Sequence, residues 1–289
     1  MNRSCTRFVI AALLGCATAQ TQAVPMRADL SVTTDESSGR SFDADFSVSP
    51  NEHLTFNLGA GHSSGSDQTA DLSGTLLNAG VSLHGERAGI ALAYDRFDDS
   101  SNYRSATLGA RGWVAAGDFE FALLARRRDL SVRLTLALPN RTLTRDVDFA
   151  ALGGGLQVSF ARGNFSAYAM AVQYDYDDDF DRFVELTQSP QLALRPRIEA
   201  LLGSFITQAQ GAIDRQSGVG IEQIFGRHAL GLDVSSVHDA ITDSGSVSVA
   251  LTWRYTQSAR FDVSVTGGMV DSDQYGDIGF LGVAVGVGN

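Results

Sequence analysis

Apolar and polar residues alternate with a period of two along most of the chain. The clearest stretch is SVSVALTWRYTQSARFDVSV at 246–265, where apolar residues take every second position up to Tyr255. A polar connection at 256–260 follows, and the alternation resumes at Phe261. Because successive side chains of a β-strand point to opposite faces, this stretch predicts two antiparallel strands joined by a turn.

Aromatic residues gather next to that connection. Trp253, Tyr255 and Phe261 all lie on the apolar side of the two strands. A membrane–water interface favours aromatic rings at the ends of hairpins, because the ring is apolar and its edge is polar. One soluble hairpin is also compatible with this arrangement, so the interpretation depends on the rest of the chain.

The same alternation recurs almost throughout, and the opposite side carries serine, threonine, glycine, alanine, aspartate and arginine. If the chain spans a membrane, the apolar side of each strand is expected to face lipid. Clear further runs have their apolar positions at Leu54, Phe56 and Leu58; Ile90, Leu92 and Tyr94; Phe119, Phe121 and Leu123; Tyr168, Met170, Val172 and Tyr174; and Leu281, Val283, Val285 and Val287.

Short and long connections alternate between these runs. The longer ones are rich in aspartate, and four of six short ones carry an arginine: Arg87, Arg162, Arg227 and Arg260. A soluble sandwich has no reason to sort charge by alternate loops. Outer-membrane barrels do sort their connections, with short periplasmic turns and longer extracellular loops.

In these features the chain resembles the Gram-negative outer-membrane β-barrel class, through its architecture and not through a specific motif. The resemblance implies an all-β, transmembrane, antiparallel up-and-down barrel in the bacterial outer membrane. It implies about 14 strands, with about 12 to 16 compatible, and periplasmic termini. Most members of the class end in an aromatic residue, whereas this chain ends in Asn289.

The N-terminal segment 1–23 is predicted to be a secretory signal peptide, and 24–289 the barrel. Arg3 and Arg7 precede a short apolar stretch at 8–15, and small residues follow at 17–19. The stretch 13–16 also resembles a lipobox, which would place a lipid on Cys16. Both cysteines lie in this segment, so the mature chain has neither a disulfide nor a thiolate metal site. No later run of about 18 apolar residues predicts a transmembrane helix.

Two segments interrupt the simple pattern. In 125–148 the apolar parity changes near Arg126, Arg127 and Arg128, which predicts a β-bulge in a hairpin that extends beyond the membrane. These arginines either contact lipopolysaccharide phosphates or lie at a solvated strand end.

The second segment, 177–216, is predicted to be a long loop with a short helix. Pro196 precedes Ile198, Leu201, Leu202, Phe205 and Ile206, which have the spacing of an amphipathic helix. The loop would lie outside the barrel, fold into it and narrow it, or contain two more strands.

Gly61-His62-Ser63-Ser64-Gly65 is the one stretch with a catalytic pattern. It resembles the His-x-Ser of outer-membrane lipid hydrolases, in which His62 would be the base and Ser64 the nucleophile, with a third group orienting the imidazole. The next strand offers no outward carboxylate or amide for that role. A plain Gly/Ser loop is the alternative.

The charge of the chain argues against nucleic-acid binding, and its acidic residues and histidines do not have the spacing of a metal site. The net charge of -11 argues against nucleic acid, which needs a basic face. The acidic run 175–181 lacks the glycine and the closing glutamate of an EF-hand, and the histidines are scattered. We therefore expect no metal and no cofactor.

Charged residues opposite the apolar side are predicted to line the lumen. About 14 strands enclose a space too wide for side chains alone to fill. The leading hypothesis is a porin-like channel for small hydrophilic solutes that prefers cations. The alternatives are the lipid hydrolase and a closed structural or secretion-associated barrel. Expected partners are outer-membrane lipids, lipopolysaccharide and small solutes, and a homo-oligomer is left open. The predicted luminal residues are Arg27, Asp29, Asp43, Asp45, Arg111, Glu120, Glu222, Asp233, Arg254 and Asp262.

Overall fold

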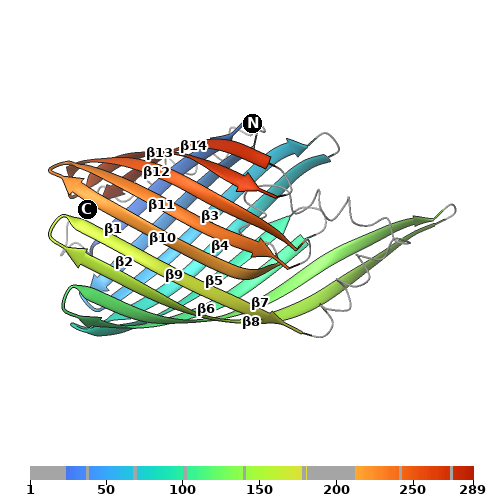
Figure 1. Cartoon of the computed structure of the whole chain (residues 1–289), viewed down its shortest axis with the longest axis horizontal. Helices are drawn as coiled ribbons and strands as arrows, with labels where there is room; N and C mark the ends of the chain where they lie inside the picture. The colour runs from blue at the N-terminus through green and yellow to red at the C-terminus, as the bar shows by residue number, and fades with distance from the viewer. Residues whose placement is uncertain are drawn as a thin grey trace.

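The computed structural model describes residues 24–36, 39–67, 70–99, 103–138, 141–177, 180, 212–240, 243–273 and 276–289. Their fold is a barrel of β-strands (Figure 1). The strands are β1 (Met26–Asp35), β2 (Arg40–Asn51), β3 (Leu54–Asp67), β4 (Ala70–His84), β5 (Ala88–Asp99), β6 (Tyr103–Ala116), β7 (Phe119–Leu138), β8 (Arg141–Arg162), β9 (Phe165–Tyr176), β10 (Ile213–Phe225), β11 (His228–Asp239), β12 (Ser244–Ser258), β13 (Phe261–Ser272) and β14 (Gly276–Gly288).

Each strand pairs with its sequence neighbours, and β1 closes the barrel against β14. The closing ladder is antiparallel and runs from Arg27 opposite Gly288 to Asp35 opposite Phe280. Closure matters because an open sheet edge in lipid leaves backbone groups without hydrogen-bond partners. The predicted all-β up-and-down barrel of 14 strands is confirmed.

The outward face of the barrel is apolar. Leu58, Leu123 and Leu251 expose 59%, 68% and 57% of their surface. Large apolar side chains at every second position of most strands make a surface suited to lipid, not to water. In the described ranges, no helix is long and apolar enough to span a bilayer. We call the end with the short connections and the described termini the turn end, and the opposite end the loop end.

The hairpin of β7 and β8 projects beyond the rest of the barrel at the loop end (Figure 1). Pairing of β7 with β6 stops at Val132 opposite Tyr103, whereas β7 and β8 remain paired to Leu138 opposite Arg141. The projection agrees with the sequence prediction, but the predicted bulge is wrong. The ladders of β7 with β6 and with β8 run without a register shift through the three arginines.

The backbone does not bulge at the arginines, so side chains keep alternating between the two faces of β7. The apolar residues that follow the arginines therefore face the lumen, not lipid. Arg126 and Arg128 point inward, and so do Leu130 and Val132 above them, while Arg127 points outward. The inward leucine and valine belong to a cluster that we call the apolar cluster. Its buried members are Phe97, Tyr103, Leu130, Val132, Phe149, Phe180 and Ala212.

Strand β9 also departs from the expected orientation. Tyr168, Met170, Val172 and Tyr174 were expected to face lipid, but they point into the barrel, and small alanines face outward instead. Val172 and Tyr174 are almost fully buried. Their inward partners on β8 are Gly155 and Gly153, and a Cβ at Gly153 would lie 2.7 Å from the Tyr174 ring. Glycine on one strand thus makes room for a large side chain on the next.

Two predicted segments fall outside the described residues: the signal peptide at 1–23 and the helix at 198–206. The described ends of the long connection are informative. β9 ends at Tyr176 and β10 begins at Ile213. Phe180 is buried and stacks on Tyr176, with ring centroids 4.1 Å apart, and Ala212 is fully buried. Both ends therefore contact the apolar cluster inside the barrel.

The apolar cluster is expected to stabilise the barrel more than equivalent contacts on the outward face. Leu130→Ala removes a side chain that is 3% exposed, whereas Leu123→Ala, on the same strand, removes one that is 68% exposed. We expect Leu130→Ala to lower the free energy of unfolding by about 2–5 kcal/mol. Leu123→Ala should lower it less, because the lipid-facing side chain loses only its transfer from water to hydrocarbon and leaves no cavity in a packed interior. Urea unfolding in detergent micelles measures both, and equal losses would show that the cluster contributes no special packing.

Candidate functional site

Side chains on the inward face meet across intervening strands, as expected for the concave side of a barrel. Arg27 on β1 lies 2.8 Å from Asp262 on β13, across β14. Tyr168 on β9 donates a hydrogen bond to Asp233 on β11, across β10. The ten residues predicted to line the lumen all occupy inward positions in the strand registers.

The three arginines in that predicted set are neutralised by carboxylates. Arg254 lies 2.8 Å from Glu222, and Arg111 pairs with Glu120. Arg27 pairs with two carboxylates, Asp29 at 2.6 Å and Asp262 at 2.8 Å. The ion pairs lie toward the turn end of the barrel. They leave that part of the lumen without an unpaired arginine from this set.

Three other carboxylates have only neutral partners among the described residues. Asp45 accepts a hydrogen bond from Asn78 Nδ2 at 3.2 Å, and Asp233 accepts one from Tyr168. Asp43 accepts weaker bonds from two serine hydroxyls, at 3.4 and 3.5 Å. Neutral donors do not cancel charge, so the lumen retains negative charge at these three positions.

Glycines on β3 fix how two of these carboxylates lie. A Cβ at Gly61 would collide with Asp43, and one at Gly59 would collide with Asp45 and Asn78. The carboxylates of β2 therefore lie across the backbone of the neighbouring strand, close to the wall. The barrel keeps its width beside them.

Two luminal arginines were not predicted from the sequence. The predicted bulge at 126–128 left open which of these residues face the lumen. Arg126 donates to the Tyr174 hydroxyl at 3.1 Å and to Gln216 Oε1 at 3.4 Å. Arg128 is 4% exposed, and its guanidinium lies 5.0 Å from the Tyr174 ring centroid. Both interact electrostatically with Asp95 on β5. The register of β7 with its two neighbours places them inward, whereas the sequence gives no simple signal because its apolar parity changes beside them.

The lumen consequently has two unlike halves. The half formed by β5–β9 carries the apolar cluster, the arginines of β7 and the inward tyrosines. The opposite half, which we call the polar half, carries mainly small or charged inward side chains, although Val270, Ile278 and Phe280 also point inward near the loop end. Its small inward residues include Ser31, Thr33, Ser41, Ser63, Ser235, Ser248, Thr252, Ser264, Thr266 and Ala284. Side chains therefore fill less of the lumen on the polar half.

Aromatic residues ring the outward face at the turn end. Trp253 stacks between Tyr255 and His228, with centroid distances of 6.4 and 5.8 Å. Phe261, the third aromatic expected at the interface, begins β13 beside them. A second group that the sequence analysis did not single out joins Phe119, Phe121, Phe160 and Phe165 on β7–β9.

The His62 and Ser64 pair does not form a catalytic site in the described residues. Both are exposed on the outward face, opposite Phe42 and Arg40 on β2, and opposite Thr75 and Ser73 on β4. No hydrogen bond between the two side chains, and no carboxylate that orients His62, is present in the described ranges. Within those ranges, no group of three or more His, Cys, Asp or Glu side chains is placed to hold a metal ion.

Solved outer-membrane proteins have a similar architecture. An OmpT variant from Vibrio cholerae that lacks loop L8 is 8% identical, with a TM-score of 0.50, and the match covers 92% of this chain and 98% of that one. The fold is that of an outer-membrane β-barrel. Such a fold with an apolar outward band belongs in the bacterial outer membrane.

Two further solved structures match over similar lengths. The KdgM porin is 9% identical (TM-score 0.45; 90% of this chain, 98% of that one). OccK1 (OpdK) from Pseudomonas aeruginosa is 9% identical (TM-score 0.44; 92% and 98%). No protein-family model matches the chain, and no curated protein does either. At these identities the likeness concerns the fold, and function has to be argued from the lumen.

Proposed function

We propose that the barrel is a channel for small hydrophilic solutes with a preference for cations. The observation that carries the proposal is the polar half of the lumen. There, small side chains leave width, and Asp43, Asp45 and Asp233 have only neutral partners among the described residues.

The cation preference follows from how charge acts in a narrow aqueous space. A low-dielectric wall that carries one sign of charge focuses the field and raises the local concentration of counter-ions. Arg27, Arg111 and Arg254 do not offset the three carboxylates, because each is already paired. Arg126 and Arg128 lie on the opposite half, beside the apolar cluster.

Neutralising the three carboxylates should therefore weaken selectivity. In planar bilayers, Asp43→Asn with Asp45→Asn and Asp233→Asn is expected to lower the cation-to-anion permeability ratio by about twofold or more. The ratio of the unmodified barrel should also fall between about 0.1 M and 1 M salt, because screening shortens the Debye length. Asp129→Asn with Asp148→Asn, on the outward face, is the matched control. Anion preference in the unmodified channel would refute the assignment, and absence of any conductance would favour the closed barrel.

The proposal extends to the connection between β9 and β10. Its described ends, Phe180 and Ala212, are buried against the apolar cluster inside the barrel. We infer that the chain between them limits the pore. Deletion of 195–208, the segment predicted to contain the helix, is expected to raise single-channel conductance, with a deletion of residues 139–140, between β7 and β8, as control. Unchanged conductance after the first deletion would exclude this role.

Lipid hydrolysis is the rival activity, and it is tested directly. If His62 and Ser64 catalysed the reaction, the purified barrel would release fatty acid from phospholipid vesicles, and Ser64→Ala would abolish the release. We expect no release from either protein, because nothing in the described residues orients the imidazole. Hydrolysis that depends on Ser64 would replace the channel proposal.

A further inference from the structure

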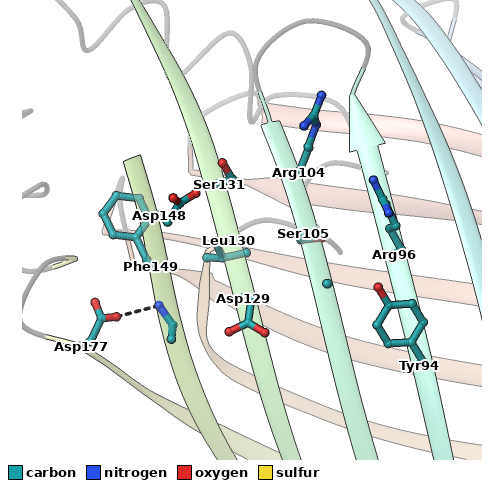
Figure 2. A pocket seen from close by; sticks show the side chains of 12 residues that line it. Tyr94, Arg96, Arg104, Ser105, Asp129, Leu130, Ser131, Asp148, Phe149 and Asp177 are labelled. Carbon is teal, nitrogen blue, oxygen red and sulfur yellow. Dashed lines mark hydrogen bonds between the residues drawn. The ribbon is translucent and has the colours of Figure 1, made fainter. Parts of the chain in front are cut away.

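A groove on the outward face has no role in transport through the lumen. It lies across β5–β8 at the loop end and has a volume of about 450 Å³ (Figure 2). Tyr94 and Arg96 come from β5, Arg104 from β6, Asp129 and Ser131 from β7, and Asp148 from β8. Asp177 closes it beside β9. We call it the outer groove.

The outer groove lies where the lipid-facing band ends. Along β5 the outward positions change from Leu92 to Tyr94 and then to Arg96. Along β6 they change from Leu108 through Ala106 to Arg104. The loop end is the extracellular side in this class of barrel, so this boundary is the level of the outer-leaflet headgroups. A tyrosine followed by an arginine is the order expected across that boundary.

On one side of the groove, two arginines are close to a single carboxylate. Arg96 and Arg104 share one carboxylate, that of Asp98, at 3.6 and 3.2 Å. Their side chains are 53% and 56% exposed, so both guanidinium groups remain accessible. At this end of the groove two guanidinium groups and one carboxylate leave a local positive charge, and guanidinium groups bind phosphate through paired hydrogen bonds.

The opposite side of the groove offers hydrogen-bond acceptors. Asp129 pairs with Arg127 at 3.3 Å, and Asp177 accepts bonds from the backbone N–H groups of Ala150 and Phe180. Asp148 has no ion pair in the described residues, and the Ser131 hydroxyl lies next to it (Figure 2). Carboxylates accept hydrogen bonds from hydroxyl groups.

We propose that the outer groove binds the phosphorylated sugar headgroup of the outer-leaflet glycolipid, the lipid A part of lipopolysaccharide. One of its phosphates lies against Arg96 and Arg104, neighbouring sugar hydroxyls face Asp148 and Ser131, and the acyl chains continue over the apolar band below Tyr94. A phosphate flanked by sugar hydroxyls matches the two sides of the groove. This site is independent of the proposed channel activity.

The test measures binding of purified lipid A to the folded barrel in detergent, by native mass spectrometry. Arg96→Gln with Arg104→Gln is expected to weaken binding about tenfold, because two charged hydrogen-bond donors are lost. Asp98→Asn should tighten binding, since it releases both guanidinium groups from their shared carboxylate. Arg162→Gln with Arg227→Gln, two arginines at the turn end, is the matched control and should change nothing.

Three outcomes would overturn the proposal. Dephosphorylated lipid A that binds as tightly would show that the arginines do not hold a phosphate. Phosphatidylglycerol or inorganic phosphate that displaces lipid A at equal concentration would show a general anion site. Equal weakening by the control pair would show that the effect is unspecific charge. If the arginine variants fold poorly, Asp98→Asn alone still tests the proposal. An Asp98→Asn barrel that folds but binds lipid A no more tightly would count against the site.

Discussion

The pairing of β1 with β14 is the constraint on which the rest of the structure depends. A hydrocarbon environment offers no water to backbone N–H and C=O groups, so each strand needs two partners. Closure meets that requirement from Arg27 opposite Gly288 to Asp35 opposite Phe280. Once the ring is closed, every strand has one face toward lipid and one toward the lumen. Which residues occupy the inward positions then decides what the protein does.

Those inward positions are used in two different ways. On β5–β9 large apolar and aromatic side chains gather at the loop end, where Phe97, Leu130 and Phe149 form a packed interior like that of a soluble protein. On most of the remaining strands the inward side chains are small or charged, with carboxylates lying close to the wall over Gly59 and Gly61. The same barrel thus combines a packed side with a more open, polar side. Close packing on the first side resists deformation of that part of the wall.

Much of this fold was predictable from the sequence, because lipid requires an apolar outward face on nearly every strand. The alternation and the alternating connection lengths were enough to predict the closed antiparallel barrel and its 14 strands. They failed where apolar residues face inward. On β9 the lipid-facing residues are alanines, and large residues such as Tyr174 pack on inward glycines of β8. On β7 the inward positions turn apolar at Leu130 without a bulge.

The candidate site was harder to predict than the fold for the same reason. Hydrophobicity reports which face touches lipid, but a partly packed lumen also contains apolar residues, so polarity alone does not identify its lining. Arg128 illustrates this, since a nearly buried arginine beneath a leucine has no simple sequence signature. Contacts across strands, such as Arg126 with Gln216, depend on barrel curvature and not on local sequence.

The projecting hairpin of β7 and β8 has a consequence for the evolution of the outer surface. Beyond Arg133 and Asp146 its two strands pair only with each other in the described residues, joined there by an ion pair at 2.8 Å. Neither the ring of strands nor the lumen depends on this part, because pairing with β6 and β9 has already ended. Changes of length or composition there leave the barrel intact. The hairpin is therefore free to vary in length and composition while the transmembrane wall stays the same.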